Sequence, residues 1–596
     1  MEPKIFYHNK LKVLQEDLKK LQQKKSVFGW LRVGSIAAII AGFYLLWNMG
    51  ILYVIVVSIM LLILFVKLLY ADLKNKVAIN HINHLININN DELKYLEERY
   101  HDFPEGNQHA LPDHLYVNDL DIFGKASLFQ YINRTTSEMG SSQLANYLQF
   151  PANPEMIIQR QSAIKELSEK IEWIEDLQAK GKDKQITTLT KIRLKKWAEE
   201  PTAFSQFKPW KWLRYLLPSI ILAIITLYIF DVVGTGMLYL FLFLFAAIAW
   251  QINKIVAPIH EKLSKIAAEL EILSRSIYHI ESTTFNTTLL KKLQSTFYSK
   301  TKNASEDITK LRKLLDKLDL RYNLVLSAPL NVILLWNLQQ VLDLEKWKSN
   351  QQKNLNTWFD ALGNIEALNS FAVLQFNQPN WVVPKIIPGY FSIEGKKIGH
   401  PLIAKVKRIT NDIEIKNNGE LMLVTGSNMA GKSTYLRSIG VNVVLAMAGA
   451  PVCAESFNIS HVQIISSMRI TDNLAESTST FYAELKKLKT IIEKVNNGEK
   501  VFILLDEILR GTNSLDRHTG SVALIKQLIK NQAAAIIATH DLDLANLKDD
   551  YPQNIINYHF DVQVSNDELF FDYCLKPGVC TSLNASILMK KIGIEL

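Results

Sequence analysis

The feature that most constrains this chain is a run of residues, Val33 to Val66, that contains no Asp, Glu, Lys or Arg. One helical crossing of a hydrocarbon layer about 30 Å thick needs only about 20 residues, so the run is long enough for two slightly short crossings. A break at Asn48-Met49-Gly50 supplies turn chemistry between the halves. The run therefore predicts a membrane hairpin of two helices, about Val33 to Trp47 and Ile51 to Val66.

A second apolar block, Tyr215 to Asn253, contains one charged residue, Asp231, at the start of a break that ends at Gly236. This block predicts a second hairpin. Basic residues flank the outer ends of both blocks and are missing from both turns. Because basic residues collect on the cytosolic side of membranes, we expect a multi-pass protein of the inner (plasma) membrane, held in the lipid bilayer by four spans, with both termini in the cytoplasm. The alternative is that the blocks form buried helix pairs of a soluble protein.

Length and composition do not identify the binding partner of the protein. At 596 residues the chain exceeds what a single hydrophobic core supports, so several domains are expected. Its three cysteines, Cys453, Cys574 and Cys580, show no paired spacing, which argues against a disulfide framework and a zinc site. The net charge of +9 suits either nucleic acid or an anionic membrane surface.

A phosphate-binding motif follows an apolar strand predicted at Leu421 to Thr425. The motif has GxxxxGKS spacing and leads into a helical pattern. Such a loop wraps phosphates with backbone N–H groups at a helix N-terminus, its lysine reaches the β and γ phosphates, and its serine holds Mg²⁺. We therefore expect ATP and Mg²⁺ here, with Lys432 and Ser433 in these roles. The predicted nucleotide-binding residues are Gly426, Ser427, Asn428, Met429, Ala430, Gly431, Lys432, Ser433 and Thr434.

Two further apolar strands are predicted to end at the same site. Val501 to Leu505 leads into Asp506 and Glu507, and Ala534 to Ala538 precedes His540 by one residue. Open parallel sheets bind ligands at the carboxyl ends of their strands. We expect Asp506 to support the metal through water, Glu507 to orient or deprotonate the attacking water, and His540 to sense the γ-phosphate. The alternative for His540 is a purely structural role.

The sequence around these motifs resembles the ATPase domain of the MutS mismatch-repair family. The resemblance is carried by TGSNMAGKSTYL at Thr425 to Leu436, DEILRGTN at Asp506 to Asn513 and MRITDNLAESTSTFYAEL at Met468 to Leu485. The steps His400-Pro401-Leu402 and Asn411-Asp412 also match the family. The resemblance is strong over about 390 to 596.

Two positions depart from the family pattern, because Ala430 and Leu509 stand where glycine is usual. A weaker resemblance covers Ser127 to Pro151, which is similar to the start of the MutS lever domain, and Asn364 to Pro384, which is similar to its closing helix. These segments bracket the second hairpin. It would then be an insertion at the place where soluble family members carry their DNA-clamp helices.

The expected fold is an α/β P-loop NTPase domain of the ABC type at the C-terminus, preceded by an all-α lever scaffold with two transmembrane helical hairpins. The predicted parts are an N-terminal cytosolic helix at 1–32, the first hairpin at 33–66, a helical linker at 67–115, the first lever part at 116–210, the second hairpin at 211–253, the second lever part at 254–389 and the ATPase domain at 390–596.

The resemblance implies an ATP hydrolase that works as a homodimer to clamp or release a macromolecule, with non-specific DNA as the family-implied partner. It also implies that Ser479 of one subunit completes the ATP site of the other. Residues 1–115 leave too little chain for the mismatch-sensing domain, so mismatch recognition is not expected. The alternatives are an ABC-type transporter with fused spans and a membrane scaffold with an inactive ATPase. The apolar spans argue against the first, and the intact Lys432, Asp506 and Glu507 against the second.

Overall fold

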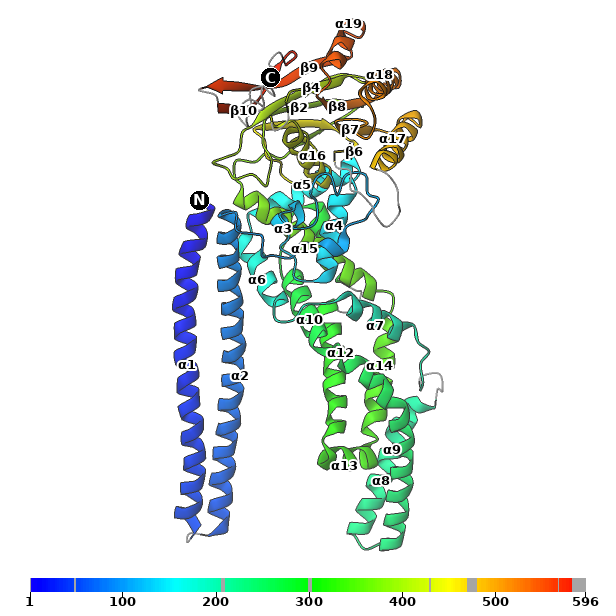
Figure 1. The fold of residues 1–596 in the computed structure, drawn as a ribbon. Coiled ribbons are helices and arrows are strands. Elements are labelled where there is room, and N and C mark those ends of the chain that lie inside the picture. The colour runs from blue at the N-terminus through cyan, green and yellow to red at the C-terminus, as the bar shows by residue number, and fades with distance from the viewer. Residues whose placement is uncertain are drawn as a thin grey trace.

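The computed structural model describes residues 2–47, 50–204, 209–298, 303–427, 430–468, 480–565 and 568–580. Figure 1 shows an α/β domain at one end of the molecule, a helical body below it, and two helical legs that extend away from the body. The N-terminal region is all-α and the C-terminal region is α/β, as the sequence predicted. The legs are α1 with α2 and α8 with α9.

The first leg consists of two long helices, α1 (Pro3–Leu46) and α2 (Ile51–Leu96), which pack along each other. Pro3 suits the first turn of a helix because that turn needs no donor from it. Each helix continues from its apolar segment into a polar segment without a break, so the predicted boundary between residues 32 and 33 lies inside α1. At this level the Arg32 guanidinium pairs with the Asp72 carboxylate at 3.0 Å.

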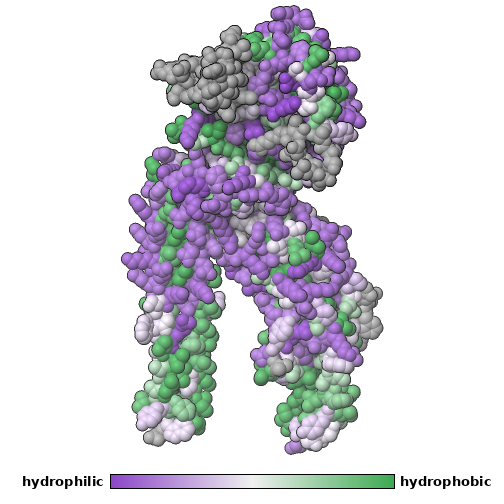
Figure 2. Space-filling view, in the orientation of Figure 1, coloured by the Kyte–Doolittle hydropathy of each residue, from purple (hydrophilic) through white to green (hydrophobic). Residues whose placement is uncertain are grey.

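The second leg consists of α8 (Trp210–Ile229) and α9 (Thr235–Ser264). By length and composition α1, α2, α8 and α9 are each apolar enough to cross a membrane, and little of their apolar windows is buried inside the molecule. Figure 2 shows that hydrophobic residues gather at the far ends of both legs, whereas the body and the polar parts of the legs are hydrophilic.

The helical body also contains an apolar element that the sequence analysis missed. Helix α13 (Leu324–Leu334) is followed by α14 (Trp336–Gln351) at a bend of 74°, with Leu335 in the left-handed region at φ 48°. The signal that could have found it is a charge-free run from Tyr322 to Leu342. The other elements of the body are η2 (Asn107–His109), α3 (Leu128–Ile132), α4 (Glu138–Gln149), α5 (Pro154–Ser168), α6 (Ile171–Gly181), α7 (Thr188–Glu199), α10 (Ala267–Glu281), α11 (Thr288–Ser295), α12 (Ala304–Asp319), η3 (Leu320–Tyr322) and α15 (Leu355–Asn377).

The two segments that resemble the MutS lever pack directly on each other, as α4 against α15. The buried Glu366 of α15 accepts hydrogen bonds from Thr136 Oγ1 at 2.7 Å and from Ser137 Oγ at 2.6 Å. Ser137 caps α4 by accepting from the Gly140 N–H. Gly140 has no room for a side chain, because a Cβ there would lie 2.1 Å from the Glu366 carboxylate. The start and the end of the lever segment are therefore held together through one buried carboxyl group.

A buried polar network joins the first leg to the lever helices. Arg134 donates from Nε to Glu92 Oε1 of α2 at 2.5 Å and from NH2 to Glu92 Oε2 at 3.1 Å, and its guanidinium stacks on Tyr95. Asn377 of α15 donates to the same carboxylate at 2.8 Å and accepts from the Tyr7 hydroxyl of α1 at 2.9 Å. Both leg helices are thus fixed to α15, which leads into the α/β domain.

The α/β domain contains two sheets. The larger has the strand order β10-β9-β4-β8-β7-β6, in which only the β9–β10 pair is antiparallel; the smaller has the order β1-β5-β2-β3. The strands are β1 (Lys385–Ile387), β2 (Ile393–Ile398), β3 (Asn411–Ile415), β4 (Leu421–Thr425), β5 (Ser456–Ser460), β6 (Gln463–Ser467), β7 (Val501–Asp506), β8 (Ala534–Thr539), β9 (Ile555–Ser565) and β10 (Glu568–Pro577). The helices are α16 (Lys432–Ala448), α17 (Thr480–Asn496), α18 (Ser514–Lys530), η4 (Leu542–Asn546) and α19 (Leu547–Asp550).

The central strands β4, β7 and β8 are buried along their whole length. Continuous apolar runs suit this position, because a parallel sheet is covered by helices on both faces. Helix α16 lies close to the sheet, since a Cβ on Gly440 would be 2.7 Å from Leu120 and 2.9 Å from Leu504. The body thus reaches into the domain core through Leu120.

Candidate active site

The three strands predicted to carry the site are neighbours in the sheet, in the order β4, β8, β7. Thr425 at the end of β4 is level with Thr539 at the end of β8, and Asp506 at the end of β7 is level with Ala538. Because the strands are parallel, the residues that follow them emerge at one edge. This arrangement brings together the phosphate-loop residues, the two carboxylates after β7 and the histidine after β8.

The phosphate loop turns sharply between β4 and α16. Gly426 and Gly431 have φ angles of 151° and 107°, which other residues rarely adopt. A Cβ at Gly426 would lie 2.8 Å from the Phe560 carbonyl oxygen, and one at Gly431 would lie 3.0 Å from the Tyr573 ring. Ala430 is buried, and Ser433 and Thr434 occupy the first turn of α16. The predicted residues Asn428 and Met429 lie outside the described part of the chain.

Lys432 begins α16 and is buried at the centre of the site. Its ammonium donates to the carbonyl oxygens of Gly426 at 2.9 Å and Ser427 at 3.0 Å. Burial lowers the pKa of Lys432 to about 8, and the nearby carboxylates of Asp506 and Glu507 offset part of that effect. Lys432 is therefore mainly protonated at neutral pH and can attract an anion.

Ser433 and Asp506 lie in direct contact, with the Ser433 hydroxyl donating to Asp506 Oδ2 at 2.5 Å. The other carboxylate oxygen, Asp506 Oδ1, is buried and has no hydrogen-bond partner among the described residues. A hydroxyl and a carboxylate with a spare buried oxygen form a donor set that suits a hard cation such as Mg²⁺.

Glu507 adopts a left-handed backbone conformation, with φ at 54°. Its carboxylate accepts from two sides, from His540 Nε2 at 2.6 Å and from Arg510 Nε at 3.0 Å. The hydrogen bond from His540 lowers the pKa of Glu507, so its carboxylate is ionised at neutral pH. The Lys432 ammonium lies 3.1 Å from Nε2 and 3.4 Å from Nδ1 of the same ring. His540 therefore links the phosphate-loop lysine to Glu507.

The loop after Glu507 is held by a second buried carboxylate, which the sequence analysis did not place in the site. Glu484 of α17 accepts from the backbone N–H groups of Leu509 and, at 3.1 Å, Arg510. Leu509 is also in the left-handed region, with φ at 58°. This conformation explains why glycine is usual at that position in the family pattern.

A cavity of about 380 Å³ adjoins these groups. Its polar lining includes Lys432, Ser433, Thr434 and Glu507 and also Lys407, Asn411 and Ser438. Its apolar and aromatic lining consists of Ile398, Ile403, Ile409, Tyr435, Phe560 and Tyr573. A small molecule with both a charged part and a flat apolar part matches this mixed lining.

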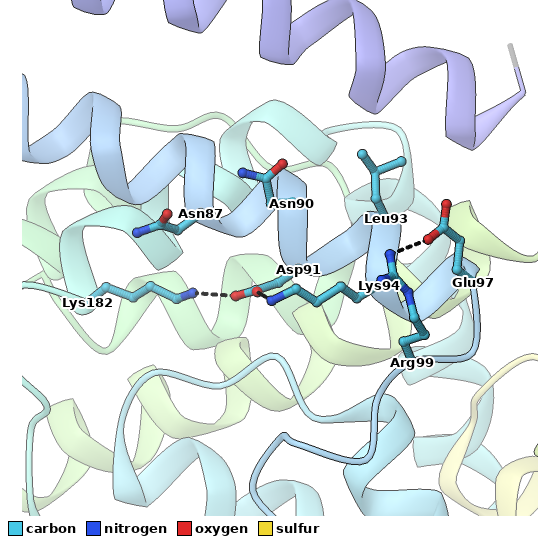
Figure 3. A pocket seen from close by; sticks show the side chains of 8 residues that line it. All are labelled: Asn87, Asn90, Asp91, Leu93, Lys94, Glu97, Arg99 and Lys182. Carbon is cyan, nitrogen blue, oxygen red and sulfur yellow. Dashed lines mark hydrogen bonds and ion pairs between the residues drawn. The ribbon is translucent and has the colours of Figure 1, made fainter.

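A second hollow, of about 670 Å³, lies at the end of α2 and lacks these features. Figure 3 shows that its three cations contact its two carboxylates. Lys94 and Lys182 both reach Asp91, at 3.1 and 3.4 Å, and Arg99 pairs with Glu97. Every charged residue in this lining takes part in one of these ion pairs, and the lining has no pair of a hydroxyl and a carboxylate like that of Ser433 and Asp506.

Comparison with known proteins identifies the α/β domain. The family model for MutS domain V matches residues 422–590. The C-terminal region of the chain belongs to the MutS family. The DNA mismatch repair protein MutS of Aquifex pyrophilus is 33% identical over 223 residues, which cover 36% of this chain and 25% of that protein. MutS protein homolog 4 of Homo sapiens is 34% identical over 205 residues, covering 33% of this chain and 22% of that protein. The chain thus matches about a quarter of the length of these relatives.

Within the MutS domain V, two contributors to the site besides Glu484 were not predicted. Arg510 pairs with Glu507 and donates from NH2 to the Asp506 carbonyl oxygen at 3.1 Å. The sequence signal that could have indicated Arg510 is its position three residues after Glu507. Tyr573 lies against the phosphate loop because Asn411 donates to its carbonyl oxygen at 3.0 Å. No local pattern indicates that contact, which depends on β10 passing the loop. The predicted partner-facing Ser479 lies outside the described residues.

Proposed function

We propose that the chain is a membrane-anchored MutS-like ATPase that binds and hydrolyses ATP as a dimer in order to clamp or release a macromolecule, without recognising mismatches. The observation that carries this proposal is the meeting of Lys432, Ser433, Asp506, Glu507 and His540 at one sheet edge beside a cavity that also has apolar and aromatic lining.

The residues of the cavity fit ATP with Mg²⁺. Backbone N–H groups from Gly426 to Thr434 and the Lys432 ammonium would hold the phosphates, while the apolar and aromatic lining suits a nucleobase. Ser433 and Asp506 would hold the metal, which neutralises charge on the phosphate oxygens. The partnerless Asp506 Oδ1 supports this assignment. Glu507 would orient or deprotonate the attacking water, and His540 would hold Glu507 in place and sense the γ-phosphate.

The ATPase proposal is tested with two variants of the purified full chain in detergent. Lys432→Ala should weaken nucleotide binding, because it removes the cation over the phosphates. Glu507→Ala should retain binding and lose nearly all hydrolysis. Equal turnover of Glu507→Ala and wild type would refute the catalytic assignment. Adding DNA to the same assay tests the partner, and ATPase activity that DNA leaves unaltered would count against DNA.

Membrane anchoring is supported by the side chains at the borders of the first leg. Trp30 and Tyr70 are exposed near the polar border, where Arg32 pairs with Asp72, and Trp47 and Tyr53 are exposed near the turn. Aromatic residues gather at both interfaces of a membrane span, and charged residues near its end reach the interface. Four spans with a cytosolic ATPase domain would place both termini in the cytoplasm, at the inner (plasma) membrane.

A homodimer would complete each ATP site with Ser479 of the partner, because the phosphate-loop residues cover the nucleotide from one side only. The alternative is that Ser479 only caps its own helix. A mixed dimer separates the two roles. If Ser479→Arg and Lys432→Ala chains are each inactive as homodimers, their heterodimer should recover one working site. No recovery in a verified heterodimer would refute the trans role.

DNA is the partner that the names of the relatives favour. We propose that such binding rests on contacts to phosphates, which carry no sequence information. We therefore expect affinity that falls steeply with salt and does not distinguish mismatched from matched duplexes.

A further inference from the structure

Helix α13 is too short to cross a bilayer and too apolar for an aqueous surface. It lies within the charge-free run from Tyr322 to Leu342. Its 11 residues rise about 16 Å at 1.5 Å per residue, about half of a hydrocarbon layer of about 30 Å. The 74° bend at Leu335 sets α13 nearly perpendicular to α14. These dimensions suit a segment that enters one leaflet as α13 and leaves on the same side through α14.

The position of α13 places it beside the apolar part of the second leg. α13 contacts both α8 and α9, and Figure 1 shows it closing the lower ends of α12 and α14. Polar contacts mark the level above it. Arg214 at the start of α8 pairs with Asp343 of α14 at 3.0 Å, and Asn337 donates to Asn253 of α9 at 3.2 Å.

α14 begins at Trp336, seven residues before Asp343, or about 10 Å along the helix axis. The bend therefore lies about 10 Å along α14 from the level at which Asp343 pairs with Arg214. α13 ends at this bend. Its contacts with α8 show that it lies at the level of a candidate span.

The outer face of α13 is apolar and uncovered within the described chain. Val325 is 82% exposed, and Leu326, Ala328 and Pro329 are also exposed. The opposite face is packed, because Val332 and Ile333 contact the main core. The exposed face continues the apolar surface of α8 and α9, so whatever covers those helices also reaches α13.

Aromatic and basic side chains precede α13 and lie near the polar ends of the α8 and α9 spans. The exposed Tyr322 and its neighbour Arg321 precede the helix, and exposed Trp212 and Trp250 lie on α8 and α9. The Lys254 ammonium lies 3.6 Å from the centre of the Trp250 ring. Trp, Tyr and basic residues near the end of a span are typical of the headgroup region on the cytosolic side.

We propose that α13 is a re-entrant helix that inserts to half depth in the cytosolic leaflet, with lipid acyl chains covering Val325, Leu326 and Pro329. This inference rests on the proposed membrane anchoring of α8 and α9. It gives the lever scaffold a contact with the bilayer between α12 and α14, so a movement of these helices would displace lipid.

The test measures the depth of a fluorescent probe in the full chain, reconstituted into vesicles of phosphatidylcholine and phosphatidylglycerol. The probe is an environment-sensitive dye on a single introduced cysteine, in a Cys574→Ser background because Cys453 and Cys580 are buried. The sites are Val325→Cys, Met60→Cys in the α2 span and Val406→Cys, which is 99% exposed in the α/β domain. Quenching is compared between lipids with a nitroxide high or low on the acyl chain.

The shallow nitroxide should quench the Val325 dye at least about twofold more strongly than the deep one. The Met60 dye should be quenched by the deep nitroxide, and the Val406 dye by neither. A quenched Met60 dye with an unquenched Val325 dye would overturn the inference while leaving the anchoring intact. This includes a blue-shifted Val325 dye, which would mean that protein covers α13. Deep quenching at Val325 equal to that at Met60 would make α13 part of a span. No quenching at either site would overturn the membrane anchoring itself.

Discussion

Leu509 offers a test in which one backbone angle decides whether the glycine variant or the alanine variant is the more stable. Its side chain is 8% exposed and belongs to the core cluster beneath α18, while its φ of 58° lies in the left-handed region. That conformation costs a residue with a Cβ about 1–2 kcal/mol, and glycine avoids the cost. Leu509→Ala loses the packing, about 2–3 kcal/mol for a site that can partly collapse, and keeps the strain. Leu509→Gly loses slightly more packing and relieves the strain.

We therefore expect the stability order wild type, then Leu509→Gly, then Leu509→Ala, with glycine about 1 kcal/mol above alanine. The matched control is Leu524 in α18, which is equally buried in the same cluster but lies in a helix. There the order of the two variants should reverse, because glycine in a helix interior costs about 1 kcal/mol relative to alanine.

Pulse proteolysis of the detergent-purified full chain along a urea gradient measures the stability of the glycine and alanine variants at both positions. A difference of 1 kcal/mol shifts the midpoint by about 0.3–1 M, given urea slopes of about 1–3 kcal/mol/M. A second measurement uses Gly520, where an added Cβ would lie 2.4 Å from Leu509 Cδ1. Gly520→Ala should destabilise the wild type and stabilise Leu509→Gly. The reasoning fails if Leu509→Gly unfolds before Leu509→Ala, as at Leu524.

The remaining predictions concern the membrane, the buried ion pair, pH and DNA. The full chain should sediment with membranes and resist carbonate extraction, because the far ends of both legs are apolar; recovery in the soluble fraction would contradict the anchoring. Glu92→Ala should destabilise the folded chain by about 3–5 kcal/mol, because it leaves the Arg134 charge buried without its partner. Replacing both residues by apolar ones should recover most of this loss in the same proteolysis assay. Burial lowers the pKa of His400 to about 4 from an ordinary value of 6.5, so the neutral ring favours the folded state above pH 6.5. That stabilisation, up to about 3 kcal/mol, should be lost as the pH falls from 6.5 to 4, and His400→Gln should flatten this dependence. Affinity for DNA should fall with salt and differ less than tenfold between mismatched and matched duplexes at one salt concentration.

Much of the candidate site was predictable because its chemistry is encoded locally. The strands at Leu421–Thr425, Val501–Asp506 and Ala534–Thr539 are continuous apolar runs, and each is followed at once by residues of the site. Parallel pairing brings such ends to one edge, so convergence could be expected without coordinates. The apolar helices of both legs followed in the same way, from length and the absence of charge alone.

The sequence by itself thus determined the three strands that lead into the site, the apolar helices of the two legs, and the lysine, serine, carboxylate and histidine residues that follow those strands. It could not determine contacts between residues far apart in the chain, because no local pattern records its partner. Arg134 finds Glu92 and Asn377 only once α2 and α15 pack, and Glu484 fixes the backbone of Leu509 only once α17 lies against the loop. Tertiary packing also decided the place of α13, whose apolar run would suit a buried core helix equally well. Its contacts with α8 and α9, and the face that they leave exposed, arise only when the helices pack together.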